Sequence, residues 1–253
     1  MWKSRFYFPG AKVPLIICVM KHHGKKYNAA KKLVEKPLYE LSEAVALLKK
    51  TSTTKFDASC EVHMKLGLDP KRADQLLRGT VVMPNGTGKK VRVIAFVLDS
   101  QVNAAKAAGA IEAGADELID KVAKGWLDFD VAVATPEIMK SMGKVAKTLG
   151  QKGLMPNPKA GTVTTDVSKT IGEIIKGKVE FRMDKLANVH NVFGKVSFSE
   201  AHLEENLKAF IRAILAAKPS GAKGIFMQSI TIASTMGPGI GVDVSKATTG
   251  LGA

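Results

Sequence analysis

The residues best suited to bind another molecule are Thr235, Met236 and Gly237, which follow an alternating stretch and precede Pro238 and Gly239. Glycine permits backbone torsions closed to other residues, and proline fixes one torsion and removes a donor. We expect a rigid corner whose backbone can approach a partner closely. The chain carries 38 Lys and Arg against 23 Asp and Glu, a formal net charge of +15, so the expected partner is a polyanion.

Two segments lack the glycine pattern that nucleotide binding requires. The Gly86–Lys90 loop lacks the spacing of a phosphate loop and precedes a strand instead of a helix. Asp99-Ser100-Gln101 stands where a dinucleotide-binding domain would carry its glycines. We therefore interpret Gly86 and Gly88 as a hinge between domains, with Lys178 on the returning segment.

No pattern in the chain predicts catalysis or metal binding. The histidines share no metal-ligand spacing, and Cys18 and Cys60 suit a reducing compartment. The spacing supports neither a Ser/His/Asp arrangement nor a pair of carboxylates. We predict no enzyme activity, no cofactor and no metal.

The elements that position these residues fall into three zones. The first zone has a helical stripe over 41–48, an alternating strand over 60–68 and a neighbouring strand over 78–83. The middle zone predicts buried strands over 91–98 and 130–134, with helices over 101–110, 118–124 and 137–149. The last zone predicts strands over 178–183, 191–198 and 224–233, and a helix through 203–214 that ends before Pro219.

Neither end of the chain holds enough strands for a sheet alone, which predicts one α+β domain built from both termini. Residues 20–86 and 178–253 form this domain I, with an antiparallel sheet and helices. Residues 87–177 form an inserted α/β, Rossmann-like domain II with a parallel sheet. Domain I carries 22 basic and 13 acidic residues, net +9, against 13 and 10, net +3, in domain II, so domain I is the expected RNA binder.

Residues 1–19 stand apart as an N-terminal extension with three basic residues and no acid. Its apolar run is too short to span a membrane, and we expect no membrane association. The alternative is that Met20 is the true start of the chain.

Several motifs in order resemble one family. They are Lys55-Phe56-Asp57, Glu61-Val62-His63, Leu66-Gly67-Leu68-Asp69-Pro70, Gln75 to Thr80, Gly153 to Val163 and Thr235-Met236-Gly237-Pro238. Together they resemble large-subunit ribosomal protein one in its bacterial form, from about Lys21 to Val244. Single motifs are weak signals, but the ordered set is highly specific.

The resemblance implies a two-domain fold with hinge motion and a function without catalysis. Members bind a structured stalk of large-subunit rRNA, assist release of deacylated tRNA from the exit site, and repress translation of their own mRNA. It implies a cytoplasmic protein of the ribosome that is a monomer when free. Two other interpretations stay open: a non-ribosomal RNA-binding relative acting in ribosome assembly, and an α/β enzyme using the inserted domain.

The resemblance also places RNA contacts on matching positions. These are Lys55, Phe56, Ser59 and Glu61 near the first strand, and Ser229, Thr235, Met236 and Gly237 near the last. Strand parity puts Ser59, Glu61, Ser229 and Thr235 on non-core faces, and small hydroxyls suit RNA 2′-hydroxyl groups. Phe56 could instead be a core residue. Phosphate attraction is expected from Lys55, Arg72, Arg182, Lys185 and the basic run with Lys21, His22, Lys25 and Lys26.

Overall fold

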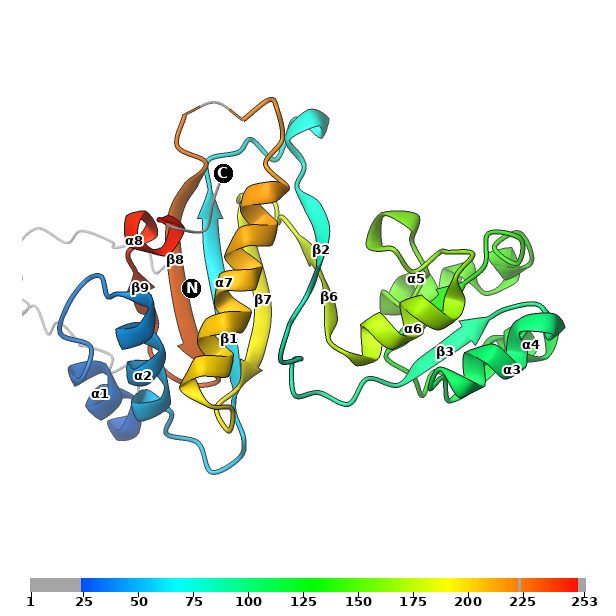
Figure 1. Cartoon of the computed structure of the whole chain (residues 1–253), viewed down its shortest axis with the longest axis horizontal. Helices are drawn as coiled ribbons and strands as arrows, with labels where there is room; N and C mark the ends of the chain where they lie inside the picture. Colours follow the sequence, from blue (N-terminus) through cyan, green and yellow to red (C-terminus); the bar gives the residue numbers. More distant parts are fainter. Residues whose placement is uncertain (1–23, 223, 250–253) are drawn as a thin grey trace, which may run out of the picture.

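The computed structural model describes residues 24–222 and 224–249 of the 253-residue chain. Two bodies lie side by side and are joined by a pair of strands (Figure 1). The larger body contains a four-stranded antiparallel sheet, and the smaller body contains a three-stranded parallel sheet. The predicted combination of an antiparallel sheet with helices and a separate parallel sheet is confirmed.

The antiparallel sheet has the strand order β7 (Asn188–Lys195), β1 (Ser59–Leu66), β8 (Met227–Ser234) and β9 (Ile240–Val242). Side chains in β1 alternate as predicted: Cys60, Val62, Met64 and Leu66 are buried, and the residues between them are half-exposed. The sheet therefore has one core face and one face toward solvent. We call the second face, which carries Ser59, Glu61, His63 and Lys65 of β1, the open face.

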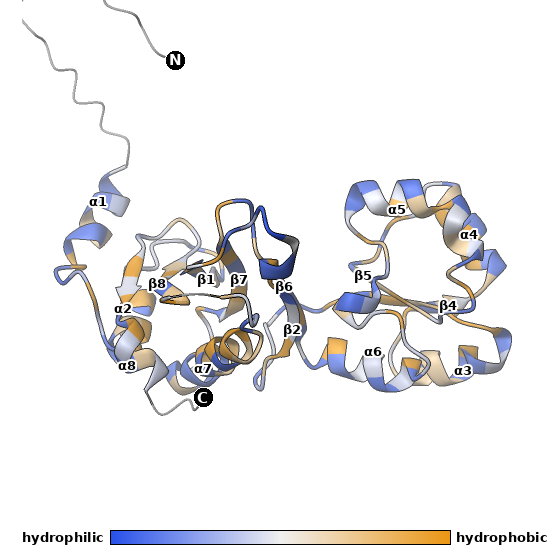
Figure 2. Cartoon of the chain, turned by 90° about the horizontal axis from the view of Figure 1, so that it is seen from above, coloured by the Kyte–Doolittle hydropathy of each residue, from blue (hydrophilic) through white to orange (hydrophobic). Residues whose placement is uncertain are grey.

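Helices cover only the core face of this sheet (Figure 2). α2 (Leu41–Thr51) packs on β8 and β9, and α7 (Glu200–Ala216) packs on β7 and on α2. The predicted apolar stripe of α7 is fully buried, and Ser199 caps the helix by accepting a hydrogen bond from the His202 N–H. The short helices α1 (Lys25–Lys32) and α8 (Val244–Thr248) and the 3₁₀ turn η1 (Ala73–Gln75) complete the larger body.

The strand predicted to neighbour β1 does not join that sheet. β2 (Arg78–Val82) pairs with β6 (Lys178–Arg182) in a separate antiparallel ribbon, with Arg78 opposite Arg182 and Val82 opposite Lys178. The prediction was wrong because β1 has β7 on one edge and β8 on the other, which leaves no edge for a third partner. The ribbon instead links the two bodies (Figure 1).

The parallel sheet has the order β4 (Glu112–Gly114), β3 (Val93–Phe96) and β5 (Val131–Ala134). All four residues of the central strand β3 are buried, as predicted for a strand covered on both faces. Ile94 and Phe96 pack with α4 (Asp116–Ala123) and α5 (Ala146–Lys152). Val93 and Ala95 pack with α3 (Asp99–Ala107) and α6 (Val167–Ile175) on the opposite face.

Other elements differ from prediction in extent. The helix expected over 137–149 is broken into a 3₁₀ turn, η2 (Ser141–Lys144), and α5. Gly143 has low helix propensity, and Val145, with φ −106° and ψ −1°, separates the two elements. β7 begins three residues earlier than predicted, because the Asp184 carboxylate accepts the Leu186 and Asn188 N–H groups in a tight turn. β4, α6, β9 and the 3₁₀ turn η3 (Pro158–Ala160) had no predicted counterpart.

Candidate nucleic-acid interface

The pairing of β1 with β8 brings together the two halves of the predicted RNA site. Cys60 lies opposite Ser234, so the chain before β1 runs beside the chain after β8. The Thr235 N–H donates to the Ser59 carbonyl oxygen at 3.0 Å, and the Ser59 N–H donates to Thr235 Oγ1 at 3.1 Å. Residues 176 positions apart thus form one end of the sheet.

A tight turn presents Met236 at this end of the sheet. The Gly237 N–H donates to the Ser234 carbonyl oxygen at 2.8 Å, which closes the turn. Met236 lies at its third position with φ 66°, as in a type II turn, and its side chain is 76% exposed. A large apolar side chain held outward in a left-handed conformation is a strained arrangement that is typical of contact sites.

The glycines of this turn act differently from prediction. Gly237 and Gly239 were expected to supply unusual torsions, but neither has a positive φ, and Met236 carries that torsion. Gly237 is required by close approach, since a Cβ there would lie 2.3 Å from Ser234 Oγ. The corner therefore depends on space at Gly237 and on backbone strain at Met236.

The segment before β1 presents a second apolar side chain. Phe56 is 60% exposed, so the alternative that it is a core residue is wrong. Lys55 is exposed beside it. The Asp57 carboxylate fixes the segment by accepting hydrogen bonds from Ser197 N–H at 3.1 Å and Ser197 Oγ at 2.9 Å. An exposed aromatic ring on an anchored segment can stack on a base or pack on a ribose.

Lys195 is a residue of this site that sequence reasoning missed. Its Nζ donates to Ser59 Oγ at 2.9 Å and to the Asp57 carbonyl oxygen at 3.4 Å. Lys195 lies opposite Ser59 in the β1–β7 register. One ammonium group thereby orients the Ser59 hydroxyl and brings positive charge to the same end of the sheet.

Glu61 and Ser229 lie on the open face, as strand parity predicted. Glu61 is opposite Ala233 of β8, and Ser229 is opposite Lys65 near the other end of β1. Ser229 is exposed, and Glu61, Ser59 and Thr235 are half-exposed. The structure therefore places Ser229 along the sheet from the Thr235–Gly237 turn, not in direct contact with it.

Of the predicted phosphate-contacting residues, Lys55 lies on the segment that leads to Ser59, and the others belong to other elements. Arg182 and Lys185 line one groove with Arg78 and Lys159, and Arg72 is exposed near η1. Lys25 and Lys26 are exposed on α1, and Lys21 and His22 lie outside the described residues. Met183, next to Arg182, is buried in the core. These basic residues are spread over α1, the segment before η1, and β6 with the turn that follows it.

The predicted hinge residues lie where the ribbon meets the smaller body. Gly86 and Gly88 have φ values of 68° and 74°, which favour glycine. A Cβ on Gly177, which was not predicted, would lie 2.7 Å from the Gly86 Cα, so the two crossing segments touch there. Lys178 Nζ pairs with Glu173 at 3.0 Å.

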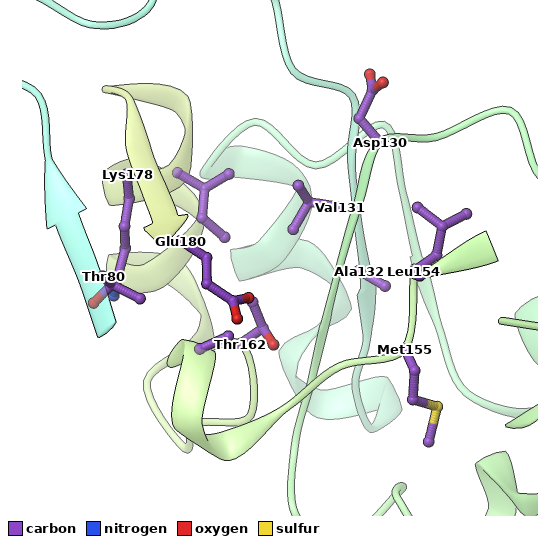
Figure 3. A pocket seen from close by; sticks show the side chains of 12 residues that line it. Thr80, Asp130, Val131, Ala132, Leu154, Met155, Thr162, Lys178 and Glu180 are labelled. Atoms are coloured by element: carbon purple, nitrogen blue, oxygen red, sulfur yellow. The ribbon is translucent and has the colours of Figure 1, made fainter. Parts of the chain in front are cut away.

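A pocket of about 140 Å³ lies between the ribbon and the parallel sheet (Figure 3). Asp130 and Lys178 line it, but both are engaged within the protein. Hydrogen bonds from Lys89 and from the Arg92 backbone lower the pKa of Asp130 to about 2. Its carboxylate is thus held ionised by these hydrogen bonds, which suits a structural role better than proton transfer.

Other chemistry finds little support in the part of the chain that the structure describes. Burial raises the pKa of the Cys60 thiol to about 12, so it stays protonated. Within residues 24–222 and 224–249, no group of three or more His, Cys, Asp or Glu side chains could hold a metal ion. In the same ranges, no helix combines the length and apolar character needed to cross a bilayer.

Comparison with known proteins identifies similar chains. A sequence model of the family described as "Ribosomal protein L1p/L10e family" matches residues 48–238. Two curated relatives, both named large ribosomal subunit protein uL1 and both from strains of Lactobacillus delbrueckii subsp. bulgaricus, are 53% identical to this chain over 225 residues. Each alignment covers 88% of this chain and 97% of the relative. The matched residues include β1, β8 and the Thr235–Gly237 turn.

Proposed function

This chain belongs to the ribosomal protein L1p/L10e family, and on that premise we propose that it binds a structured stalk of large-subunit rRNA. The sequence-based prediction of a ribosomal protein is confirmed by the family match. This family consists of ribosomal proteins, not enzymes.

The observation that carries the proposal is the shared edge made by Ser59 and Thr235. Two segments far apart in sequence meet there through reciprocal hydrogen bonds, and each presents an exposed apolar side chain, Phe56 and Met236. Hydroxyl and backbone groups beside apolar side chains suit the shallow minor groove and the 2′-hydroxyls of folded RNA. Lys55 and Lys195 add the charge that phosphates require.

We assign RNA binding to a terminal domain of residues 20–86 and 178–253, with residues 87–177 inserted as a second domain. Gly86, Gly88 and Lys178 lie at the crossing and would serve as the hinge. As the family resemblance implies, the same protein would assist release of deacylated tRNA from the exit site and repress its own mRNA. If rRNA and mRNA bind at the same surface, one molecule of the protein cannot act in the ribosome and repress its mRNA at the same time.

The proposal is tested by Thr235→Ala and Met236→Ala in a filter-binding assay with a large-subunit rRNA fragment. Each substitution should weaken binding by about 1–3 kcal/mol. Thr235→Ala leaves a buried polar group of the RNA without its hydrogen-bond partner, and Met236→Ala removes an apolar contact. Ile111→Ala, which removes a comparably exposed apolar side chain from the smaller body, is the matched control and should bind like the wild type.

Circular dichroism and urea unfolding establish that each variant is folded. Unchanged affinity of both folded variants would rule out the Thr235–Gly237 turn as an RNA contact. A failure of the wild-type protein to bind rRNA more tightly than an unrelated RNA would contradict the proposed function itself.

A further inference from the structure

Two histidines meet on the open face. His63 of β1 lies directly opposite His190 of β7, and their Nδ1 atoms are 2.9 Å apart. At this distance one Nδ1 carries a hydrogen and donates it to the other, which accepts it. The ring centroids are 5.0 Å apart in an edge-on arrangement. Neither histidine has a part in the contacts proposed above.

Each ring also has a carboxylate on its other side. Glu61 Oε2 is 3.9 Å from His63 Nε2, and Asp184 Oδ2 is 3.5 Å from His190 Nε2. The Asp184 carboxylate is held ionised mainly by the backbone N–H of Asn188, which lowers its pKa. The remaining polar neighbours on the same strands and turn are Lys65, Asn188, Ser229 and Thr231.

This arrangement has two protonation states with different binding properties. In the neutral pair, the single hydrogen between the two Nδ1 atoms is used internally. One added proton goes to the free Nε2 of the donating ring, which faces a carboxylate, and leaves the Nδ1–Nδ1 hydrogen bond in place. When both rings are protonated, each Nδ1 carries a hydrogen, so the two atoms can no longer bond to each other. Two N–H donors with positive charge then face the same space, while Glu61 and Asp184 compensate charge at the Nε2 atoms.

We propose that His63 and His190 form a phosphate-binding site of the open face, which binds a backbone phosphate of the RNA when both rings are protonated. The inference rests on the proposed function, because it needs RNA at the Ser59–Thr235 edge. His63 is four residues from Ser59 along β1, a distance of about 13 Å at the rise of a β-strand. An RNA strand seated at that edge can continue over the pair.

The sign of the pH effect follows from the surroundings of His63. Burial lowers its pKa, the neighbouring His190 lowers it further, and Glu61 opposes both. A phosphate against the Nδ1 atoms stabilises the imidazolium, so the pKa in the complex is higher than in the free protein. Binding then takes up a proton, and RNA affinity rises as pH falls through the interval between these two pKa values.

The test compares rRNA affinity at about pH 7.5 and about pH 5.5 for four proteins at fixed salt concentration. They are the wild type, His63→Gln, His190→Gln and the matched control His202→Gln, which removes an exposed histidine from α7. The wild type and the control should gain about threefold to tenfold in affinity on acidification, equivalent to a pKa shift of up to one unit. His63→Gln and His190→Gln should gain less than about twofold.

His190→Lys supplies a second test that does not depend on the fold of the His63 variant, because His190 is exposed. A fixed cation there should give higher affinity at neutral pH and a flatter pH dependence. An equal gain on acidification in all four proteins, or a His190→Lys variant that matches His190→Gln, would overturn the histidine site.

A third measurement separates this inference from the proposed function. The ring NMR signals of His63 and His190 are titrated with and without sulfate, which resembles a phosphate but does not itself titrate in this range. Sulfate should raise the pKa of His63, shift the His190 ring signals with it, and leave the His202 signals unchanged. No movement would overturn the site whatever the RNA result, whereas a lack of rRNA binding by the wild type would overturn only the proposed function.

Discussion

At the scale of single residues, Lys195 shows how one side chain can organise a contact surface. Its ammonium group joins the Ser59 hydroxyl to the Asp57 carbonyl, so it fixes the segment that carries Phe56. Its role is to position these groups and to add charge at the end of the sheet. Loss of the ammonium should therefore affect binding more than folding.

We expect Lys195→Met to lower rRNA affinity by about 1–2 kcal/mol, the scale of a charge-assisted hydrogen bond. Lys208→Met is the matched control, since it also removes one positive charge and breaks a pair, with Glu204 at 2.7 Å on α7. Filter binding measures affinity, and urea unfolding should give similar stabilities for the two variants. Equal losses of affinity in the two variants would show that Lys195 contributes to binding only through the net charge of the protein.

The sequence could predict side-chain direction but not every partner. Alternation in β1 correctly placed Ser59 and Glu61 away from the core. The contact between Ser59 and Lys195 depends on the register with β7, which shifts at a bulge between Cys60 and Glu61. A local pattern contains no information on that register. The sequence also did not predict the positive φ of Met236, because positive φ is ordinarily expected at glycines, here Gly237 and Gly239.

At the scale of elements, α7 holds the chain that leaves the larger body. Asn206 is fully buried in this helix. Its Oδ1 accepts the Asn85 N–H at 3.0 Å, and its Nδ2 donates to the carbonyl oxygens of Gly86 and Phe193, both at 2.8 Å. One amide thereby joins α7, β7 and the segment after β2. The helical pattern predicted α7 but assigned no role to this position.

Replacement of Asn206 by Ala should destabilise the protein by about 2–4 kcal/mol, because buried backbone groups lose their partners. Asn206→Asp is the informative second variant, since it can still accept from Asn85 but cannot donate to the two carbonyls when ionised. Urea unfolding measures the free energy of both. A change below about 0.5 kcal/mol for Asn206→Ala would mean that water replaces the amide without cost.

Elements were predictable where the apolar period is long and uninterrupted. The apolar stripe over 203–214 predicted α7, and the apolar run over 91–98 predicted β3. β4 has only three residues, Glu112 to Gly114, all half-exposed, and no period to detect. The pairing of β2 with β6 was also hidden, because strand patterns identify strands and not their neighbours.

At the scale of the whole molecule, each body has a core of its own. Buried side chains of the larger body come from residues 39–83 and 181–247, and those of the smaller body from residues 93–174. The crossing between them is narrow, with Gly86 against Gly177 and the Met83 N–H donating to the Gly177 carbonyl oxygen at 3.1 Å. Separate cores predict that the larger body can fold without the smaller one.

We therefore expect that replacing residues 88–176 by two glycines leaves a folded protein that binds rRNA. The ends to be joined already touch, so the linker imposes little strain on the β2–β6 ribbon. All the contacts proposed at the Ser59–Thr235 edge remain, and filter binding should give an affinity within about tenfold of the full chain, or 1.4 kcal/mol. Thr235→Ala introduced into the shortened protein should weaken binding by the same factor as in the full chain. A shortened protein that keeps a cooperative unfolding transition but loses rRNA binding would instead assign essential contacts to residues 88–176.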